Sequence, residues 1–185
     1  MDHASPTRQS GATLTEALVG LGIAAGALGL AAPSLQGTID SVRLSSASNA
    51  VLADLYLARS EALRRNRRVA LCKSPDGLHC SQQGGWEQGW ILFEDGNNSG
   101  TIDADEPLIN RHPGLEQPLL LRGNQPVSAY ISYSPVGATK LTGGGFQAGT
   151  LTLCRQSATP TASRHLVLNA IGRPRVQKAT SDSCG

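Results

Sequence analysis

The C-terminal region contains the residues best suited to bind an anionic ligand. It includes the run Gly172, Arg173, Pro174 and Arg175. A guanidinium group presents N–H donors in a planar fork that matches the oxygens of a phosphate. Gly172 lets the backbone turn, and Pro174 stiffens the segment, so the arginines lose less conformational freedom on binding. Between residues 155 and 178 there are five bases and no acid, namely Arg155, Arg164, Arg173, Arg175 and Lys178. This segment therefore predicts an anion-binding site.

An acidic stretch, residues 94–106, holds five acids and no base. Its spacing matches several positions of an EF-hand calcium loop, with Gly100 at the turn and Glu106 at the twelfth position. The candidate ligands are Asp95, Asn97, Asp103 and Glu106. The preceding run, 90–93, is strand-like rather than helical, and Asp, Asn and Gly also favour turns. A hairpin loop without a metal is therefore the favoured prediction, and a calcium site is the weaker alternative.

Motifs for catalysis are absent from the sequence. No serine stands in a G-x-S-x-G setting, and the glycine run 143–145 is not followed by the Lys and Ser or Thr of a phosphate-binding loop. The cysteines form no CxxC pair, so a zinc site is not expected. The histidines are scattered singly, at His3, His79, His112 and His165. We therefore expect a non-enzymatic protein without a cofactor.

The N-terminal region carries one long apolar stretch. Residues 17–39 contain no charge, and about 20 apolar residues span a bilayer as a helix. Glu16 immediately precedes this stretch. An ordinary secretory signal, cleaved near residues 25–27, is the alternative. An acid at this place opposes ordinary signal function and is costly in a membrane unless it has a partner. The sequence therefore predicts export and a single membrane-anchoring helix.

The four cysteines are Cys72, Cys80, Cys154 and Cys184. An even number in an exported chain indicates two disulfides, for which three pairings exist. We favour Cys72 with Cys80 and Cys154 with Cys184, because each bond closes a loop containing Gly, Pro or Ser beside a predicted strand. Each bond would stabilise the domain by roughly 2–4 kcal/mol. The second bond would make the basic segment a tethered loop rather than a loose tail.

The expected fold class is α+β, with a long N-terminal helix packed on an antiparallel β-sheet. Beyond Pro33 the helix should continue amphipathically to residue 68, because apolar residues recur every three or four positions. These residues are Leu44, Ala47, Val51, Leu55, Ala58 and Ala62. Gly, Pro and Asn clusters then separate short β runs. The predicted strands are 69–73, 89–94, 107–111, 119–122, 129–134, 150–155 and 165–170.

Residues 11–16 read Gly-Ala-Thr-Leu-Thr-Glu, and with the apolar helix that follows they resemble the signal of type IV pilins. The resemblance implies that prepilin peptidase cuts after Gly11 and that Ala12 is methylated, although Phe most often follows the cut. It implies that Glu16 pairs with the terminal amine of a neighbouring pilin. It also implies a single-pass inner-membrane protein whose periplasmic or extracellular head becomes part of a pilus.

Two further motifs resemble the GspH/FimT group of minor pilins and pseudopilins. One is Trp-Ile-Leu-Phe-Glu-Asp-Gly-Asn at 90–97, followed by Gly100, Asp103, Glu106 and Leu108. The other is Leu-Val-Leu-Asn-Ala-Ile-Gly-Arg at 166–173. The resemblance implies a type IV pilin-like fold. It divides the chain into a leader (1–11), a transmembrane and assembly helix (12–35), an amphipathic helix (36–68) and a β-rich head (69–185).

The run 172–175 also resembles a Gly-Arg-x-Arg motif of FimT-type members, which bind DNA during natural transformation. The resemblance implies that Arg173 and Arg175 contact DNA and that Gly172 belongs to the same site, while charge alone adds Lys178 and Arg164. Stacking on bases is not expected, because no aromatic residue stands near Arg173 in the sequence. DNA capture by a minor pilin is the expected function. The alternatives are a structural minor pilin of the FimU type, at the tip or in priming, and a GspH-like pseudopilin of type II secretion.

Overall fold

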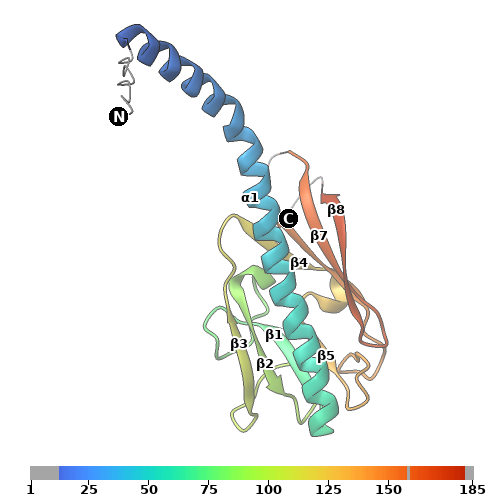
Figure 1. Ribbon diagram of the computed structural model, residues 1–185. Coiled ribbons are helices and arrows are strands. Elements are labelled where there is room, and N and C mark those ends of the chain that lie inside the picture. Colours follow the sequence, from blue (N-terminus) through green and yellow to red (C-terminus); the bar gives the residue numbers. More distant parts are fainter. Residues whose placement is uncertain (1–12, 158, 182–185) are drawn as a thin grey trace, which may run out of the picture. The chain divides into compact units, whose positions relative to one another are not determined.

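An N-terminal helix packs against antiparallel β-sheets, which confirms the predicted fold class (Figure 1). The structure is a computed structural model that describes residues 13–157 and 159–181, without the side chains of 27–36 and 181. The chain divides into two units, Met1–Asp40 and Ser41–Gly185. All the described strands belong to the second unit, which we call the head.

Helix α1 (Leu14–Arg65) begins at a local sequence signal. The backbone N–H of Thr13 donates to Glu16 Oε2 (2.9 Å), and the Glu16 N–H donates to Thr13 Oγ1 (3.3 Å). This reciprocal arrangement is a capping box, and it satisfies N–H groups that have no partner within the first helical turn. Glu16 therefore has a structural task at the start of α1, in addition to the pairing that the pilin resemblance implies.

The other end of α1 is set by a residue with a left-handed backbone. Asn66 has a φ of 52°, a conformation that Asn tolerates better than most residues. The next N–H, of Arg67, donates to the carbonyl oxygen of Ala62 (3.3 Å). This Schellman-type cap satisfies a carbonyl of the last turn. It ends the helix at Arg65, where the sequence predicted residue 68.

The described strands form two four-stranded antiparallel sheets. The first has the order β3-β2-β1-β5, made by β1 (Val69–Lys73), β2 (Gly89–Glu94), β3 (Leu108–Pro113) and β5 (Tyr130–Tyr133). The second has the order β4-β6-β7-β8, made by β4 (Leu119–Gly123), β6 (Gly149–Arg155), β7 (Thr161–Leu168) and β8 (Pro174–Ser181). Short 3-10 helices, η1 (Trp86–Gln88) and η2 (Gln125–Val127), precede β2 and β5.

The last two strands differ most from the prediction. β7 begins at Thr161 and ends at Leu168, whereas the sequence predicted 165–170. The part of the basic segment from Pro174 onward forms strand β8, which was not predicted, where a loop was expected. Its largely polar residues show no apolar alternation, and such a pattern does not reveal an exposed edge strand. Pro174 is tolerated as the first residue of this edge strand, where it need not donate a ladder hydrogen bond.

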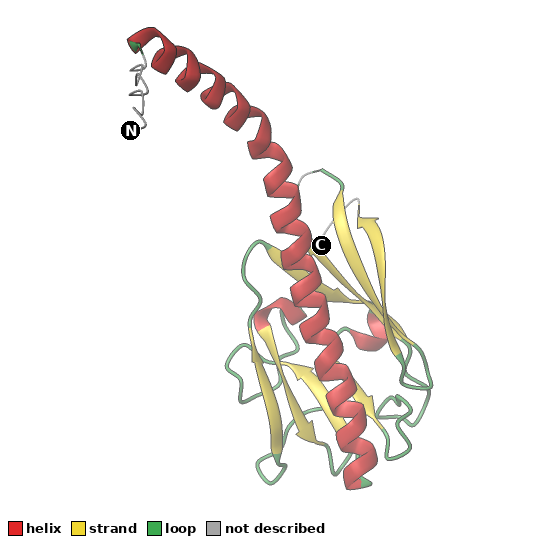
Figure 2. Ribbon diagram, in the orientation of Figure 1, coloured by secondary structure: helices red, strands yellow, loops and turns green. Residues whose placement is uncertain are grey.

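One hydrophobic cluster joins α1 to both sheets and forms the main core of the head. Figure 2 shows the helix running along the strands of the head. The predicted apolar face of α1 is buried in it, through Leu44, Ala47, Val51, Leu55, Ala58 and Ala62. The sheets contribute, among others, Leu71, Leu92 and Ile131 from the first and Leu121, Leu153 and Leu166 from the second. A smaller cluster, Ala70, Cys72, Ile91 and Phe93, also belongs to the first sheet. Alternate residues of β1 and β2 thus enter different clusters, so the first sheet is buried on both faces.

A buried carboxylate ties α1 to the first sheet. Asp54 on α1 is 6% exposed. Its oxygens accept hydrogen bonds from Trp90 Nε1 (2.8 Å) and Asn110 Nδ2 (3.0 Å). The Trp90 ring also stacks on His112, with 4.0 Å between ring centroids. Hydrogen bonds are directional and apolar contacts are not, so this cluster fixes the position of the helix on the sheet.

The first predicted disulfide is confirmed. Cys72 and Cys80 are bonded, with 5.5 Å between their Cα atoms. The Lys73 ammonium donates to two backbone carbonyls of the same loop, at 2.9 and 3.2 Å, and burial lowers the pKa of Lys73. Cys154 is also disulfide-bonded. Its predicted partner, Cys184, lies outside the described residues.

The predicted N-terminal segment falls partly outside the described residues. Gly11 and Ala12, the predicted processing site, are among the residues that are not described. Glu16 is exposed in the first turn of α1. Within the part of the chain that the structure describes, no helix combines the length and apolarity needed to cross a bilayer.

We predict that Asp54→Ala lowers the free energy of unfolding by about 2–3 kcal/mol, because it leaves the buried donor of Trp90 and the partly buried donor of Asn110 without an acceptor. Urea denaturation of the full-length chain in a non-ionic detergent, followed by tryptophan fluorescence, measures this change. Asp105 is exposed, and Asp105→Ala is the control, with an expected change below about 0.5 kcal/mol. Equal stability of the two variants would contradict the anchoring role of Asp54.

Candidate nucleic-acid interface

The arginine motif lies in the tight turn between β7 and β8, which we call the arginine turn (residues 169–175). The two strands pair up to Leu168 and Pro174. The Gly172 N–H donates to the Asn169 carbonyl oxygen, and the Arg173 N–H donates to Asn169 Oδ1, both at 2.9 Å. Gly172 has a φ of 75°, which favours glycine. The turn is therefore held by its own backbone and by one asparagine side chain.

Side chains of α1 support the arginine turn from the core side. Arg59 Nη1 donates to the Gly172 carbonyl oxygen (3.2 Å), and the Tyr56 hydroxyl donates to the Pro174 carbonyl oxygen (3.2 Å). Gly172 also lies so close to Gly137 that a Cβ atom at residue 172 would collide with the Gly137 carbonyl oxygen. The turn is thus fixed against the helix and against the loop that follows β5.

Arg173 and Arg175 are both exposed on this supported turn. No ion pair between described residues involves either of them. Arg175 lies opposite Val167 in the β7–β8 ladder, on the face of the sheet turned away from the core residue Leu166. The two predicted DNA-contacting guanidinium groups are therefore accessible to a ligand.

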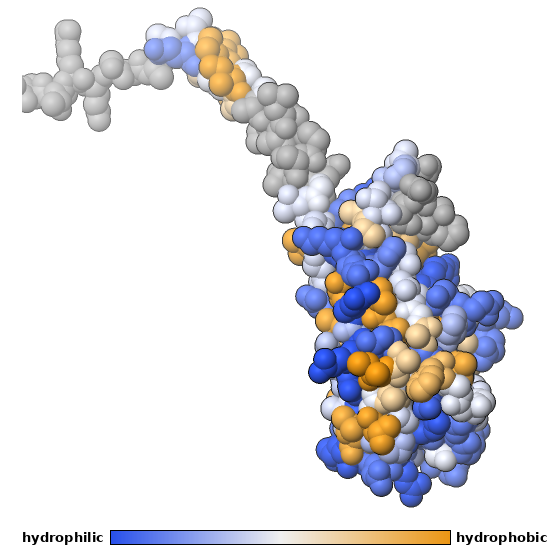
Figure 3. All heavy atoms as spheres, turned by 90° about the vertical axis from the view of Figure 1, so that its right-hand side faces the viewer, coloured by the Kyte–Doolittle hydropathy of each residue, from blue (hydrophilic) through white to orange (hydrophobic). Residues whose placement is uncertain are grey.

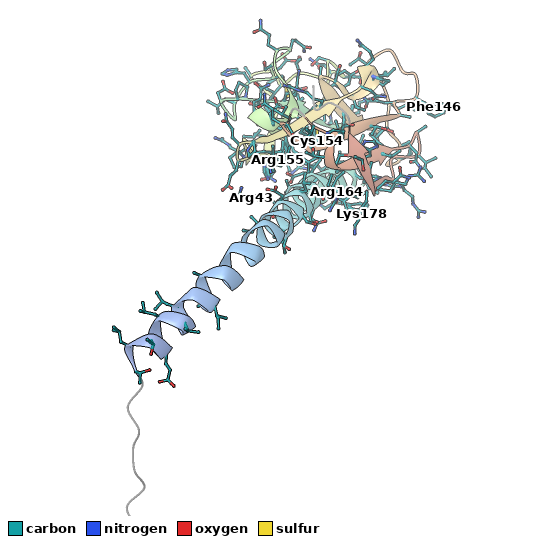
Figure 4. The ribbon with its side chains drawn as sticks, turned by 90° about the horizontal axis from the view of Figure 1, so that it is seen from above. Arg43, Phe146, Cys154, Arg155, Arg164 and Lys178 are labelled. Atoms are coloured by element: carbon teal, nitrogen blue, oxygen red, sulfur yellow. A yellow bond between two sulfur atoms is a disulfide. The ribbon has the colours of Figure 1, made fainter. Side chains whose placement is uncertain are left out.

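The two weaker candidates lie elsewhere. Lys178 is five residues beyond Arg173, roughly 16 Å along an extended strand. It pairs with Arg164 in the ladder, on the face opposite to that of Arg175. Arg164 is 6% exposed, and its Nη2 donates to Ser45 Oγ on α1 (3.4 Å). Figure 4 shows both side chains close to α1. The structure therefore does not bring Arg164 and Lys178 together with the arginine turn.

Other arginines at the end of α1 are engaged by acids. Glu61 accepts from Arg64 and Arg65, and Arg65 also pairs with Glu94 (3.2 Å). Arg67 lies 3.9 Å from the same Glu94 carboxylate. The hydrogen bonds from the arginines lower the pKa of Glu61. This cluster is partly neutralised, in contrast to the two arginines of the turn.

The acidic loop uses its carboxylates to hold its own backbone. Asp95 is fully buried and accepts the N–H groups of Ser99 (2.9 Å) and Gly100 (3.1 Å). Glu106 accepts the N–H groups of Gly96 (2.7 Å) and Asp103 (3.0 Å). Asn97 donates its side-chain amide to the Asp103 carboxylate (2.7 Å).

These bonds give the loop the internal contacts of a hairpin connection, in which Asp and Asn side chains satisfy backbone groups. Burial raises the pKa of Asp95, the direction expected for a carboxylate removed from water. In the described residues, no cluster of three or more His, Cys, Asp or Glu side chains is arranged to hold a metal ion.

Tyr56 and Arg59 of α1, which hydrogen-bond to the arginine turn, were not predicted to belong to the site. Nor were Lys140 and Phe146, which lie on the loop that is hydrogen-bonded to the turn at Thr139. The expectation that no aromatic residue lies near Arg173 holds along the sequence but is wrong in three dimensions. Tyr56 and Arg59, which are three residues apart on a helix, carried the only available signal, because that spacing places them on one face of α1.

A helix packed on two antiparallel sheets, with a stabilised hairpin at the edge, gives this protein a type IV pilin-like fold. The family described as Type II transport protein GspH matches residues 47–172, and the chain belongs to this family. It is therefore a minor pilin or pseudopilin of a type IV pilus or a type II secretion system. The matched region ends before Arg173, so family membership does not assign a role to the two arginines.

Solved structures share the fold. Two crystal structures of the type IV minor pilin FimU from Pseudomonas aeruginosa match with TM-scores of 0.56 and 0.53 and identities of 20% and 18%. Each match covers 77% of this chain, and 95% and 100% of the FimU chains. The minor pseudopilin EpsH of the Vibrio cholerae type 2 secretion system matches with a TM-score of 0.48 and 12% identity, over 73% of this chain and 96% of its own. No curated protein matches the sequence.

We predict that Gly172→Ala lowers the free energy of unfolding by about 2 kcal/mol or more, because the new Cβ collides with Gly137 and the φ of 75° strains any L side chain. Urea denaturation measures the change. Gly143 has no atom within 4 Å of an added Cβ, so Gly143→Ala is the matched control. A Gly172 variant as stable as this control would show that the turn is not constrained as described.

We predict that calcium at about 1 mM, the range of extracellular calcium modules, changes neither the melting temperature nor the tryptophan fluorescence. The loop carboxylates already accept backbone N–H groups, and calcium would have to displace those bonds. Magnesium at the same concentration is the control for general ionic effects. A saturable change produced by calcium alone would establish the EF-hand-like alternative.

Proposed function

We propose that this minor pilin or pseudopilin serves a type IV pilus and binds extracellular DNA through the arginine turn, for uptake in natural transformation. The observation that carries the proposal is the exposure of Arg173 and Arg175 on a hairpin that is already held in place. Side chains fixed on a rigid element lose less entropy when they bind. Phosphate oxygens match the guanidinium fork, which can hold them through two parallel hydrogen bonds.

The local charge supports the same ligand. Arg59 lies beneath the turn, with its guanidinium on the Gly172 carbonyl oxygen, and adds a third positive charge. Lys140 lies on the neighbouring loop, which is hydrogen-bonded to the turn at Thr139. No acid of the described residues forms an ion pair with Arg173 or Arg175. Such a group of charges attracts phosphates without reading the base sequence.

The N-terminal part of the proposal concerns delivery and assembly. Prepilin peptidase would remove residues 1–11 and Ala12 would become the methylated N-terminus. Residues 12–35 would hold the subunit in the inner membrane and then among other pilins, with Glu16 facing a neighbouring amine. The head would face the periplasm and, after assembly, the outside of the cell. The pilin-type signal at 11–16 supports this route.

We predict that Arg173→Ala with Arg175→Ala removes most of the affinity for DNA while the head stays folded. Contact with two to three phosphates gives the natural chain a log–log salt slope of roughly −2 to −3, and the double variant should reduce its magnitude by about two. Fluorescence anisotropy with a labelled oligonucleotide, in a salt titration of the full-length chain in detergent, measures both quantities.

Arg64→Ala with Arg67→Ala is the matched control. It removes the same charge from the end of α1, where both arginines lie beside acids, and it should leave DNA affinity nearly unchanged. Equal loss in the two double variants would mean that only net charge matters, and the arginine turn would not be the site. A natural chain without measurable DNA affinity would refute the DNA-binding proposal and favour a structural subunit.

A further inference from the structure

The two exposed aromatic side chains of the protein belong to the two segments that contact the arginine turn, which are α1 and the loop around Thr139. The sequence has seven Phe, Trp and Tyr residues. Four are buried, namely Trp86, Trp90, Phe93 and Tyr133, and Tyr130 is partly buried. Only Tyr56, at 49% exposure, and Phe146, at 69%, are exposed. Aromatic side chains usually bury their large apolar area. The exposed rings of Tyr56 and Phe146 are therefore available to contact a ligand.

Phe146 is brought to the turn by a shared hydrogen-bond partner. The Thr139 hydroxyl lies 2.6 Å from the carbonyl oxygen of Gln147, the residue after Phe146, and 3.1 Å from that of Asn169, the first residue of the turn. The Thr139 N–H donates to the carbonyl oxygen of Ala170 (3.3 Å). Figure 1 shows the loop after β5 next to the β7–β8 connection. The residue that follows Phe146 is therefore linked through Thr139 to the start of the arginine turn.

The loop that carries Phe146 is firmly held. Gln147 is fully buried, and its side chain accepts the Ser132 N–H (2.9 Å) and donates to two carbonyl oxygens, at 2.7 and 2.9 Å. The Tyr130 hydroxyl accepts the Thr142 N–H (3.0 Å) on the other arm of the loop. The Phe146 ring is thus displayed from a rigid base, and Figure 4 shows it projecting away from the body of the head.

One face of the Phe146 ring is already occupied by a cation. Lys140 Nζ lies 4.2 Å from the ring centroid, within the range of a cation–π interaction. The exposed remainder of the ring leaves room for a second flat partner on the other face. A nucleobase on that face would place its phosphates within the field of Lys140 and of the arginine turn.

Tyr56 borders the other end of the turn. Its hydroxyl donates to the carbonyl oxygen of Pro174, the residue between Arg173 and Arg175, while about half of the side chain stays exposed. Figure 3, which faces the side of the head that carries β7 and β8, shows apolar groups in its lower half among polar residues. Tyr56 therefore borders the β8 end of the turn, and the loop that carries Phe146 borders its β7 end.

We infer that the arginine turn binds single-stranded DNA in preference to duplex, with Tyr56 and Phe146 stacking on unpaired bases while Arg173 and Arg175 hold the phosphates between them. This inference rests on the proposed function. Alternating aromatic and basic groups suit a single strand, because its bases offer free π faces. In a duplex those faces are covered by neighbouring base pairs, and only the phosphates remain available.

The test compares three ligands of about 12 nucleotides, within the usual range of single-strand site sizes. They are a thymidine strand, an abasic strand with the same phosphates, and a duplex. Affinities are measured by anisotropy with the full-length chain in non-ionic detergent. The natural chain should bind the thymidine strand at least about fivefold more tightly than the abasic strand, because each stacked base adds to the affinity. It should also bind the duplex more weakly than the thymidine strand.

The variants separate stacking from charge. Phe146→Ala should weaken binding of the thymidine strand by about five- to tenfold and leave the abasic strand unchanged. Phe146→Trp keeps an aromatic face and should retain the preference. Val136 is an exposed aliphatic residue of the same loop, so Val136→Ala is the control and should change neither affinity. The melting temperature of each variant establishes that the head is folded.

The outcomes distinguish the inference from the proposal beneath it. Equal affinity of the natural chain for the thymidine and abasic strands, or a stronger affinity for duplex, would overturn the inference. In that case, a loss of DNA affinity in the Arg173→Ala, Arg175→Ala double variant would still support DNA binding by the turn. An equal loss for both strands in Phe146→Ala would also overturn stacking. Failure to bind any of the three ligands would overturn the proposed function itself.

Discussion

The burial of one face of α1 is the interaction on which the rest of the head depends. Each sheet presents apolar residues to this face, and the same helical segment, between Leu44 and Ala62, completes the core for both. Apolar burial supplies most of the stabilisation but little direction. The Asp54 carboxylate supplies direction, because its partners on β2 and β3 lie at defined hydrogen-bond distances. Helix and sheets therefore form one unit.

The arginine turn depends on the same helix. Tyr56 and Arg59 continue along α1 beside its buried residues, and their polar atoms reach the carbonyl oxygens of Pro174 and Gly172. A shift of the helix on the first sheet would thus also move the side chains that support the arginine turn at the edge of the second sheet. The close approach at Gly172 adds a steric limit, since no larger residue fits there. Core packing and the geometry of the candidate site are consequently linked through one element.

Sequence patterns predicted the parts of this structure that are governed by local rules. Helical periodicity identified the buried face of α1, and apolar runs located β1 and β2 without error at their ends. The edge strand β8 was not predicted, because an exposed strand carries no apolar alternation. The surroundings of Arg173 were not predicted for another reason. Tyr56 and Phe146 reach it from over a hundred and from 27 positions away along the chain, and only tertiary contacts bring them there. The motif itself was visible, but its aromatic neighbours were not.

The position of the arginine turn also bears on how proteins of this architecture diverge. Both arginines project from an exposed hairpin at the edge of a sheet, beyond the region that matches the family. Their side chains contribute nothing to the hydrophobic core, so substitutions there meet little structural constraint. On the proposed function, substitution of these two residues would remove the affinity for a polyanion while the scaffold remains intact. Relatives with this scaffold would then differ in ligand according to the residues of this hairpin.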